Sequence, residues 1–396
     1  MGLWLGVVGS LLLGQQVVRG DFLFGEPMKV PNVNSSSAEW GPSITADGLE
    51  LYFSSNRDHG IDMCYHDIWV AKRATTHETW GTPVNLGAPV NTSGPESNPC
   101  VSADGLELYF SDMFPDLYLH FGCQPRPGGY GRGDLWVSTR KTRDGPWGAP
   151  VNLGPTVNSP FYDDTPHISA DGLSLYFSSQ RLTGANKYGA THLFMATRKT
   201  KDDPWGSPVD LGPNLNNLGG VAWGLWLSYP CVSSDALSLI FSGAGSTVPT
   251  QGDIFVSRRA TVVAPWGPPT LLPAISTGSH EEGVIISASD SMLYFDRGDP
   301  FRTGAPDPAL AACDLWQVKV TPKVDFNADG VVNVLDVLVM AQNWGLIGDR
   351  GGPKTSLCDI APFPFGDGVV DAKDLLVLAE HMIENVADVK HVANVE

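Results

Sequence analysis

The stretch "SADGLELYFS" at residues 102–111 decides the fold, because the chain repeats it. Near copies stand at 45–54 ("TADGLELYFS") and at 169–178 ("SADGLSLYFS"), and weaker copies, "DALSLIF" and "DSMLYF", follow later. The five copies are headed by Asp47, Asp104, Asp171, Asp235 and Asp290, at intervals of 57, 67, 64 and 55 residues. The sequence therefore contains five copies of one repeat unit.

Two further phrases complete each unit. "DIWVAKR" at Asp67 returns as "DLWVSTR", "HLFMATR", "DIFVSRR" and "DLWQVKV", and "WGTPVNLG" at Trp80 returns near residues 147, 205 and 266. Apolar and polar residues alternate in these phrases or form short runs of β-branched and aromatic residues, which predicts strands joined by an Asp-Gly turn. Four predicted strands in a unit of this length are typical of a propeller blade.

The third phrase occurs only four times after the first two. "FGEPMKVPNVN", Phe24–Asn34, matches it at the start of the chain and should form the outermost strand of the fifth blade, beside "DLWQVKV". Such closure staples the two ends of a ring together. We therefore predict an all-β fold: a five-bladed β-propeller over residues 21–320, closed by its N-terminal strand.

The phrases resemble the TolB-type, WD-repeat-like propeller repeat, in which a Ser-x-Asp-Gly turn leads into a strand that ends in Phe. The resemblance covers about 300 residues and implies the fold, whereas propellers of this kind serve scaffolding, binding and catalysis alike. Two positions depart from the pattern: Ala236 replaces the turn glycine of the fourth unit, and His192 replaces the usual Asp of the third.

Composition narrows the class of function. The 396 residues carry a formal net charge of -18, which argues against a nucleic-acid partner. Residues 1–20 have a short apolar stretch followed by Gln15, Gln16 and Gly20, as in a secretory signal peptide, with a lipid-embedded anchor as the alternative. No later segment is long and apolar enough to span a bilayer. We therefore expect an exported, extracellular protein, with association with a cell surface as an alternative.

Six cysteines suit export, but their spacing is no metal signature. Cys100 and Cys231 lie in equivalent strands of non-adjacent units and should not reach each other. A disulfide between Cys64 and Cys123 stays open as an alternative. The histidines show no HExxH spacing, so a zinc site is not expected.

The last 75 residues change character. "DFNADGVVNVLD" places oxygen ligands at the calcium-loop positions 1, 3, 5, 7, 9 and 12, with Gly330 at the sharp turn. The predicted ligands of this first loop are Asp325, Asn327, Asp329, Val331 (through its carbonyl), Asn333 and Asp336. An altered second copy offers Asp359, Asp367, Val369, Asp371 and Asp374. We predict one or two Ca²⁺ ions here.

Two calcium loops, each followed by a short helix, resemble a type I dockerin over about 60 residues. The resemblance implies a small α-helical domain at 321–386, a tail at 387–396, and a cohesin-like protein as partner. Loop positions 10 and 11, which carry much of the partner choice in that family, are Val334 and Leu335 in one copy and Ala372 and Lys373 in the other. These are not the Ser/Thr pairs of cellulosomal dockerins, which favours another cohesin-like or cell-surface receptor.

A set of acids recurs at the start of the predicted innermost strands. Eight residues before each heading Asp stand Glu39, Glu96, Asp163, Leu227 and Glu282. The four acids could ring one mouth of the axial channel and act as general acid and base on a glycosidic bond. Equivalent positions in four repeats favour a shared architectural role over a ligand site, and a ligand site over catalysis.

Other residues could hold a ligand at this mouth, since aromatic rings stack on sugar faces while polar groups take the hydroxyls. The candidates are Trp40, Asp164, Trp223, Tyr229 and Glu281; for Trp226, packing between blades is slightly favoured. We expect a secreted, non-catalytic propeller that recognises a polysaccharide or protein. The alternatives are a glycoside hydrolase or lyase of a polysaccharide-degrading assembly, and a pure scaffold.

Overall fold

The computed structural model describes residues 22–58, 66–112, 126–181, 190–216, 226–234, 236–244, 252–287, 292–298, 313–322, 334–345, 358 and 369–379. Two compact units make up the chain: one is Leu23–Thr321, and the other joins Met1–Phe22 with Pro322–Glu396. The predicted signal peptide, the predicted tail, Cys64, Cys123 and Trp223 lie outside the described residues. No helix within the described ranges has both the length and the apolar character needed to cross a membrane.

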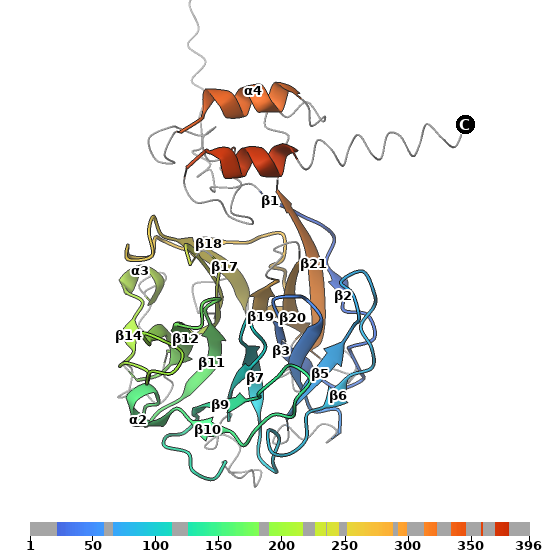
Figure 1. Ribbon diagram of the computed structural model, residues 1–396, viewed down its shortest axis with the longest axis vertical. Coiled ribbons are helices and arrows are strands. Elements are labelled where there is room, and N and C mark those ends of the chain that lie inside the picture. Colours follow the sequence, from blue (N-terminus) through green and yellow to red (C-terminus); the bar gives the residue numbers. More distant parts are fainter. Residues whose placement is uncertain are drawn as a thin grey trace, which may run out of the picture. The chain divides into compact units, whose positions relative to one another are not determined.

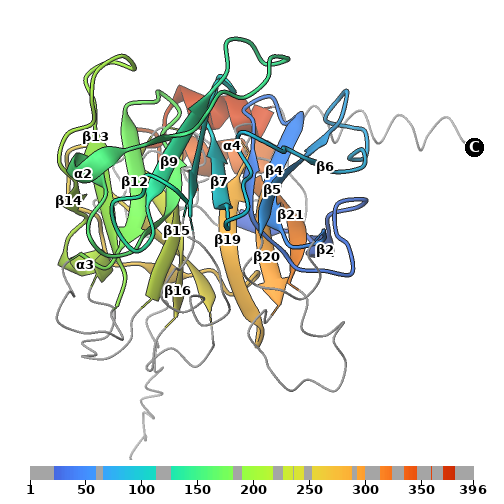
Figure 2. The same cartoon turned by 90° about the horizontal axis from the view of Figure 1, so that it is seen from below.

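The larger unit is a five-bladed β-propeller, as predicted (Figures 1 and 2). Its first blade is β3 (Glu39–Ile44), β4 (Glu50–Ser55), β5 (Asp67–Lys72) and β6 (Val84–Asn85). The second is β7 (Ser97–Val101), β8 (Glu107–Ser111), β9 (Leu135–Thr139) and β10 (Val151–Asn152). The third is β11 (Asp163–Ile168), β12 (Ser174–Ser179), β13 (His192–Thr197) and β14 (Val209–Asp210).

The fourth blade is β15 (Trp226–Val232), β16 (Ser238–Ala244), β17 (Asp253–Arg258) and β18 (Thr270–Leu271). The fifth is β19 (His280–Ile286), β20 (Met292–Gly298) and β21 (Asp314–Pro322), together with β1 (Phe22–Phe24) and β2 (Met28–Lys29). Two single-turn helices, α2 (Gly154–Val157) and α3 (Pro213–Asn216), follow the short outermost strands β10 and β14.

The Leu-Tyr-Phe part of the repeated phrase forms the core. Its side chains are the largest fully buried ones, among them Leu51, Tyr52, Phe53, Leu108, Tyr109, Phe110, Tyr176, Phe177, Tyr294 and Phe295. All of them lie on the second strand of a blade, where both faces of the sheet pack against neighbouring blades. Burial on both faces explains why the phrase is apolar at consecutive positions rather than strictly alternating.

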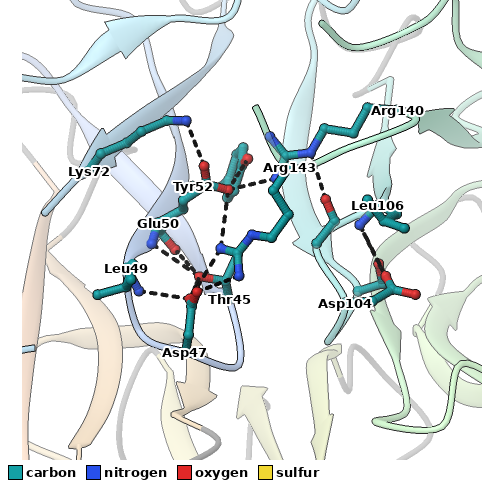
Figure 3. A network of polar contacts seen from close by, with 12 residues as sticks. Thr45, Asp47, Leu49, Glu50, Tyr52, Lys72, Asp104, Leu106, Arg140 and Arg143 are labelled. Atoms are coloured by element: carbon teal, nitrogen blue, oxygen red, sulfur yellow. Dashed lines mark hydrogen bonds and ion pairs between the residues drawn. The ribbon is translucent and has the colours of Figure 1, made fainter. Parts of the chain in front are cut away.

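Ion pairs join consecutive blades near the turns of the repeated phrase (Figure 3). Arg140 of the second blade donates to Glu50 of the first at 2.7 Å, and Lys72 approaches the other Glu50 oxygen at 2.6 Å. Arg143 of the second blade holds Asp47 of the first. Arg198 repeats the contact one blade further on, donating to Glu107 at 2.8 Å. The heading Asp and the nearby Glu therefore serve inter-blade packing.

The ring closes through the N-terminal segment, as predicted. Met28 and Lys29 of β2 pair with Gln317 and Trp316 of β21. Asn34 then brackets Leu315, accepting from its N–H at 2.8 Å and donating to its carbonyl at 2.9 Å. The same two bonds recur elsewhere between Asn91 and Ile68, Asn158 and Leu135, and Asn216 and Leu193. The N-terminal segment thus reproduces the full outer part of a blade.

The smaller unit is described in part. It contains α4 (Val334–Gln342) and a helix over 372–379. Met340, Cys358, Val370 and Leu378 form its core, and the Gly345 N–H donates to the Val370 carbonyl at 2.7 Å. This bond connects the two sequence copies.

Candidate functional site

All five innermost strands carry the same bulge. Pairing with the second strand skips two residues in each, and the residue at the skip has a positive φ between 49° and 61°. These left-handed residues are Gly41, Asn98, Thr165, Tyr229 and Gly283. A bulge redirects the side chains around it. The residues immediately before the skip, Trp40, Ser97, Asp164, Ser228 and Glu282, thereby occupy one equivalent position near the propeller axis.

The recurring acids lie one position earlier, and here one prediction was wrong. The fifth-blade member of the set is Glu281, not Glu282, because the fifth "LYF" phrase is one residue closer to its heading Asp than the others are. Glu39, Glu96, Asp163 and Glu281 are each 0% exposed. They do not line an open channel.

Each of these four acids forms an ion pair with an arginine, and we call these four pairs the arginine staples. Glu39 receives Arg57 at 3.0 Å, Glu96 receives Arg126 at 3.0 Å, and Asp163 receives Arg181 at 2.6 Å. Glu281 receives Arg297 at 2.9 Å. Every acid also accepts the N–H of the residue four positions earlier, which lies on the connection from the preceding blade.

The staple arginines also stack on the core. The Arg57 guanidinium lies 5.1 Å from the centre of the Phe53 ring and 4.8 Å from that of Trp69, and the other three make the same pair of contacts. Burial still raises the pKa of Glu96 to about 7, despite the opposing effect of Arg126. An acidic side chain that is fully buried and paired with an arginine has a structural role. These four side chains are therefore poor candidates for catalysis.

A second group of carboxylates stands apart from the staples. Glu282 on β19 and Asp296 on β20 face each other directly across the strand pair. Residues in that register have Cβ atoms about 5 Å apart, so two like charges oppose each other. Asp296 accepts from the Gly41 N–H of the first blade at 2.9 Å, and its other oxygen takes the Cys313 thiol at 3.5 Å. Burial and the charge of Glu282 raise the pKa of Asp296 to about 7.

Asp164 of the third blade completes this axial cluster, which we define as Asp164, Glu282 and Asp296. Asn98 donates to Asp164 at 2.8 Å, its neighbour Thr165 donates through the backbone at 2.7 Å, and Ser111 donates a third bond. Burial raises the pKa of Asp164 and the three donors oppose this rise. The pKa of Glu282 is also raised, by burial first and by the charge of Asp164, while His280 at 3.4 Å acts in the opposite direction.

Sequence reasoning missed Asp296, although a signal was present. The second strand ends in Phe-Ser in the first four blades, at Ser54, Ser111, Ser178 and Ser242, and only the fifth blade reads "LYFD". Ser54 accepts the Asn98 N–H of the next blade at 2.9 Å, as Asp296 accepts that of Gly41. Asp296 therefore keeps the inter-blade bond of the repeat and adds a carboxylate beside Glu282.

Of the predicted ligand residues, Tyr229 lies next to the axial carboxylates, and Trp40 is in contact with a histidine. Tyr229 donates its hydroxyl to Asn98 at 2.8 Å, and its pKa is raised well above the usual value by burial and by the axial carboxylates. Tyr229 therefore lies next to the axial cluster. Trp40 is half-buried, with its ring edge-on to His66 at 4.4 Å. Trp226, for which packing between blades was favoured, is 40% exposed.

Below the axial cluster, Cys100 and His167 meet at 3.9 Å between the second and third blades. Burial raises the pKa of the Cys100 thiol to about 11 and lowers that of His167 to about 4. Such a pair holds the thiol neutral, which is the opposite of an activated nucleophile. Cys100 and Cys231 are not joined by a disulfide, as expected.

In the smaller unit, Asp336 and Asp374 are both 0% exposed. They stand at position 12 of the two predicted calcium loops. Asp371 and Val369 are also described, whereas Asp325, Asn327, Asp329, Val331, Asn333, Asp359 and Asp367 lie outside the described residues. Where side chains are described, no three His, Cys, Asp or Glu residues converge on a possible metal position.

No known family model matches the chain, and no curated protein does so either. Among solved structures, a thermostable family-43 glycoside hydrolase is similar at 12% identity, with a TM-score of 0.48, over 74% of this chain and 92% of that one. A family 117 glycoside hydrolase from Zobellia galactanivorans matches at 10% identity, with a TM-score of 0.45, over 77% and 91%. TolB from Acinetobacter baumannii matches at 12% identity, with a TM-score of 0.38, over 72% and 55%. The sheet topology of the chain itself defines its class as the five-bladed β-propeller.

Proposed function

We propose that the propeller is a glycoside hydrolase whose site is the axial cluster, with Glu282 as general acid and Asp164 as the ionised carboxylate. The observation that carries this proposal is the cross-strand pair of Glu282 and Asp296, with Asp164 nearby on the third blade. None of the three pairs with an arginine among the described residues, in contrast to the four staple acids.

The surroundings assign the two protonation states. Glycosidic cleavage needs one carboxyl group that keeps its proton and one that has lost it. Burial disfavours the ionisation of Glu282, and the charge of Asp164 adds to this effect. Asp164 has three hydrogen-bond donors, which stabilise the carboxylate form.

Glu282 is also the accessible member of the pair, with 24% of its side chain exposed, whereas Asp296 is 3% exposed. Glu282 can therefore donate its proton to the oxygen of a glycosidic bond as that bond breaks. Asp164 can take a proton from the attacking water or stabilise the positive charge that develops on the sugar ring. Asp296 holds the blade junction by accepting the Gly41 N–H.

The test is the release of reducing ends from a panel of plant, algal and bacterial polysaccharides. The wild-type protein should release them, and Glu282→Gln should lower the rate by at least about 100-fold, as expected when a general acid is lost. Glu78→Gln, at an exposed acid in the turn between β5 and β6, is the charge-matched control and should leave the rate unchanged. Binding of a polymer without any release would instead support a non-catalytic recognition propeller.

We propose in addition that the smaller unit binds Ca²⁺ and docks the exported protein to a cohesin-like or cell-surface partner. Asp336 and Asp374, which stand at position 12 of the two predicted loops, are both fully buried. Carboxylate oxygens at this position are ligands that Ca²⁺ prefers, and the ion takes six to eight oxygen contacts in such loops. Leu338 and Leu376 stand at equivalent positions of the two helices and are 53% and 62% exposed, which suits a protein partner.

Chelation tests the calcium proposal separately from the hydrolase proposal. Removal of Ca²⁺ should lower the helical circular dichroism of the smaller unit and leave the melting of the propeller unchanged. The variant Asp336→Asn with Asp374→Asn should lose the calcium response, while Asp203→Asn in an exposed propeller turn should retain it. A helical signal that ignores both chelator and calcium would refute the proposal.

A further inference from the structure

Trp226 begins β15 at the lip of the fourth blade. Residues two apart on a strand point to the same face, so Trp226 shares a face with Ser228. Ser228 occupies the bulge position that Glu282 takes in the fifth blade. Trp226 therefore lies on the same face of β15 as the bulge position, with 40% of its surface exposed.

Trp40 lies at the same bulge position on β3 of the first blade. One face of its ring environment is fixed by His66, whose ring meets it edge-on at 4.4 Å. Most of the surface of Trp40 is covered by protein, which restricts the orientation of its ring. A fixed aromatic plane loses little conformational entropy when it binds a second flat surface.

The ring order places Glu282 between these two tryptophans. β19 of the fifth blade contacts β15 of the fourth on one side and β3 of the first on the other. Trp226, Glu282 and Trp40 thus follow one another around the mouth.

The charges at the mouth restrict the ligand further. Asp164, the ionised member of the axial cluster, places negative charge near the axis, while Arg57, Arg126, Arg181 and Arg297 are each paired with a staple acid. A carboxylate or sulfate on a sugar would be repelled here. An uncharged sugar avoids this cost.

We infer that the mouth binds an uncharged oligosaccharide of at least two rings that lies across the fourth, fifth and first blades, with one ring on Trp226 and another on Trp40. This inference rests on the proposed function for the place of the cleaved bond, over Glu282. Two separated aromatic surfaces make affinity depend on chain length, because a single sugar ring covers only one of them.

The experiment measures binding by titration calorimetry to the Glu282→Gln protein, so that no probe is cleaved. The probes are cello-, xylo- and manno-oligosaccharides of one to six residues, and oligogalacturonides of the same lengths. At least one neutral series should bind at least about tenfold more tightly as trimer than as monomer. Oligogalacturonides should bind more weakly than that series.

Trp226→Ala and Trp40→Ala, each added to Glu282→Gln, should weaken trimer binding about tenfold and leave monomer binding less affected. Trp226→Phe and Trp40→Phe keep an aromatic face and should retain most of the affinity. Val263→Ala, at a 90% exposed turn residue of the fourth blade, should have no effect.

The inference is overturned if no neutral series binds, if oligogalacturonides bind best, or if both alanine variants bind the trimer unchanged. These outcomes are separate from failure of the proposed function. Length-dependent binding by the wild-type protein without release of reducing ends would remove the hydrolase proposal and leave the ligand assignment intact. Cleavage with unchanged binding by the tryptophan variants would do the reverse.

Discussion

At the residue scale, Gly283 shows how closely the axial cluster is packed. Its φ is 61°, and a Cβ at this position would lie 1.9 Å from an oxygen of Asp296. Gly87 has a similar φ of 63° with nothing within 4 Å, so Gly87→Ala should cost only the backbone strain, about 1 kcal/mol. Gly283→Ala should cost roughly 1–3 kcal/mol more in a urea titration, because Asp296 must move. Equal losses for the two variants would contradict this packing.

Single residues also show what could not be predicted from the sequence. Aligning the heading Asp residues paired Glu282 with Glu39, whereas the strand register pairs Glu281 with Glu39. The staples were equally hidden, since Arg57 stands four residues after Phe53 but Arg297 only two after Phe295. A contact in space can be conserved between blades while its spacing along the chain is not.

At the element scale, the turn and strand phrases predicted all five blades and the N-terminal closing strand, because each phrase carries its own local structure. The bulges were not predicted, because their positive-φ residues differ in type between blades. A signal was present, since a proline, which cannot donate to the ladder, follows this residue in the first four blades. Deletion of residues 21–34 should destabilise the whole ring, because β21 loses β1, β2 and the Asn34 bracket. A denaturant midpoint lower by several tenths of a molar or more is expected, with deletion of 387–396 as control. An unchanged midpoint would argue against closure through this segment.

At the scale of the whole molecule, buried acids set the pH dependence of stability. Burial raises the folded-state pKa of Glu96, Asp112 and Asp296 to about 7 each. The folded state therefore binds these protons more tightly than the unfolded state, so their contribution is full at low pH and is lost as pH rises through 7. From pH 8 to 6.5 the free energy of unfolding should rise by about 2 kcal/mol in total. His167, with a folded-state pKa of about 4, opposes this gain only below about pH 6.5.

Thermal melting of the calcium-loaded protein across pH 6.5–8 checks this dependence. Asp296→Ser restores the residue of the other four blades and keeps an acceptor for the Gly41 N–H, so it should remove about a third of the slope. A midpoint that rises with pH over this range would show that the buried acids are ionised without cost.

The position of β21 gives the ring closure a mechanical meaning. The chain passes from the end of β21 into the smaller unit, so tension applied to that unit would reach the propeller first at Thr321. β20 lies along one side of β21, and β1 and β2 lie along the other. A pull along this strand must shear two hydrogen-bonded ladders at once before the ring opens, and without the N-terminal segment it would have to shear only one. The N-terminal segment would thus strengthen the hold of the propeller on its last strand.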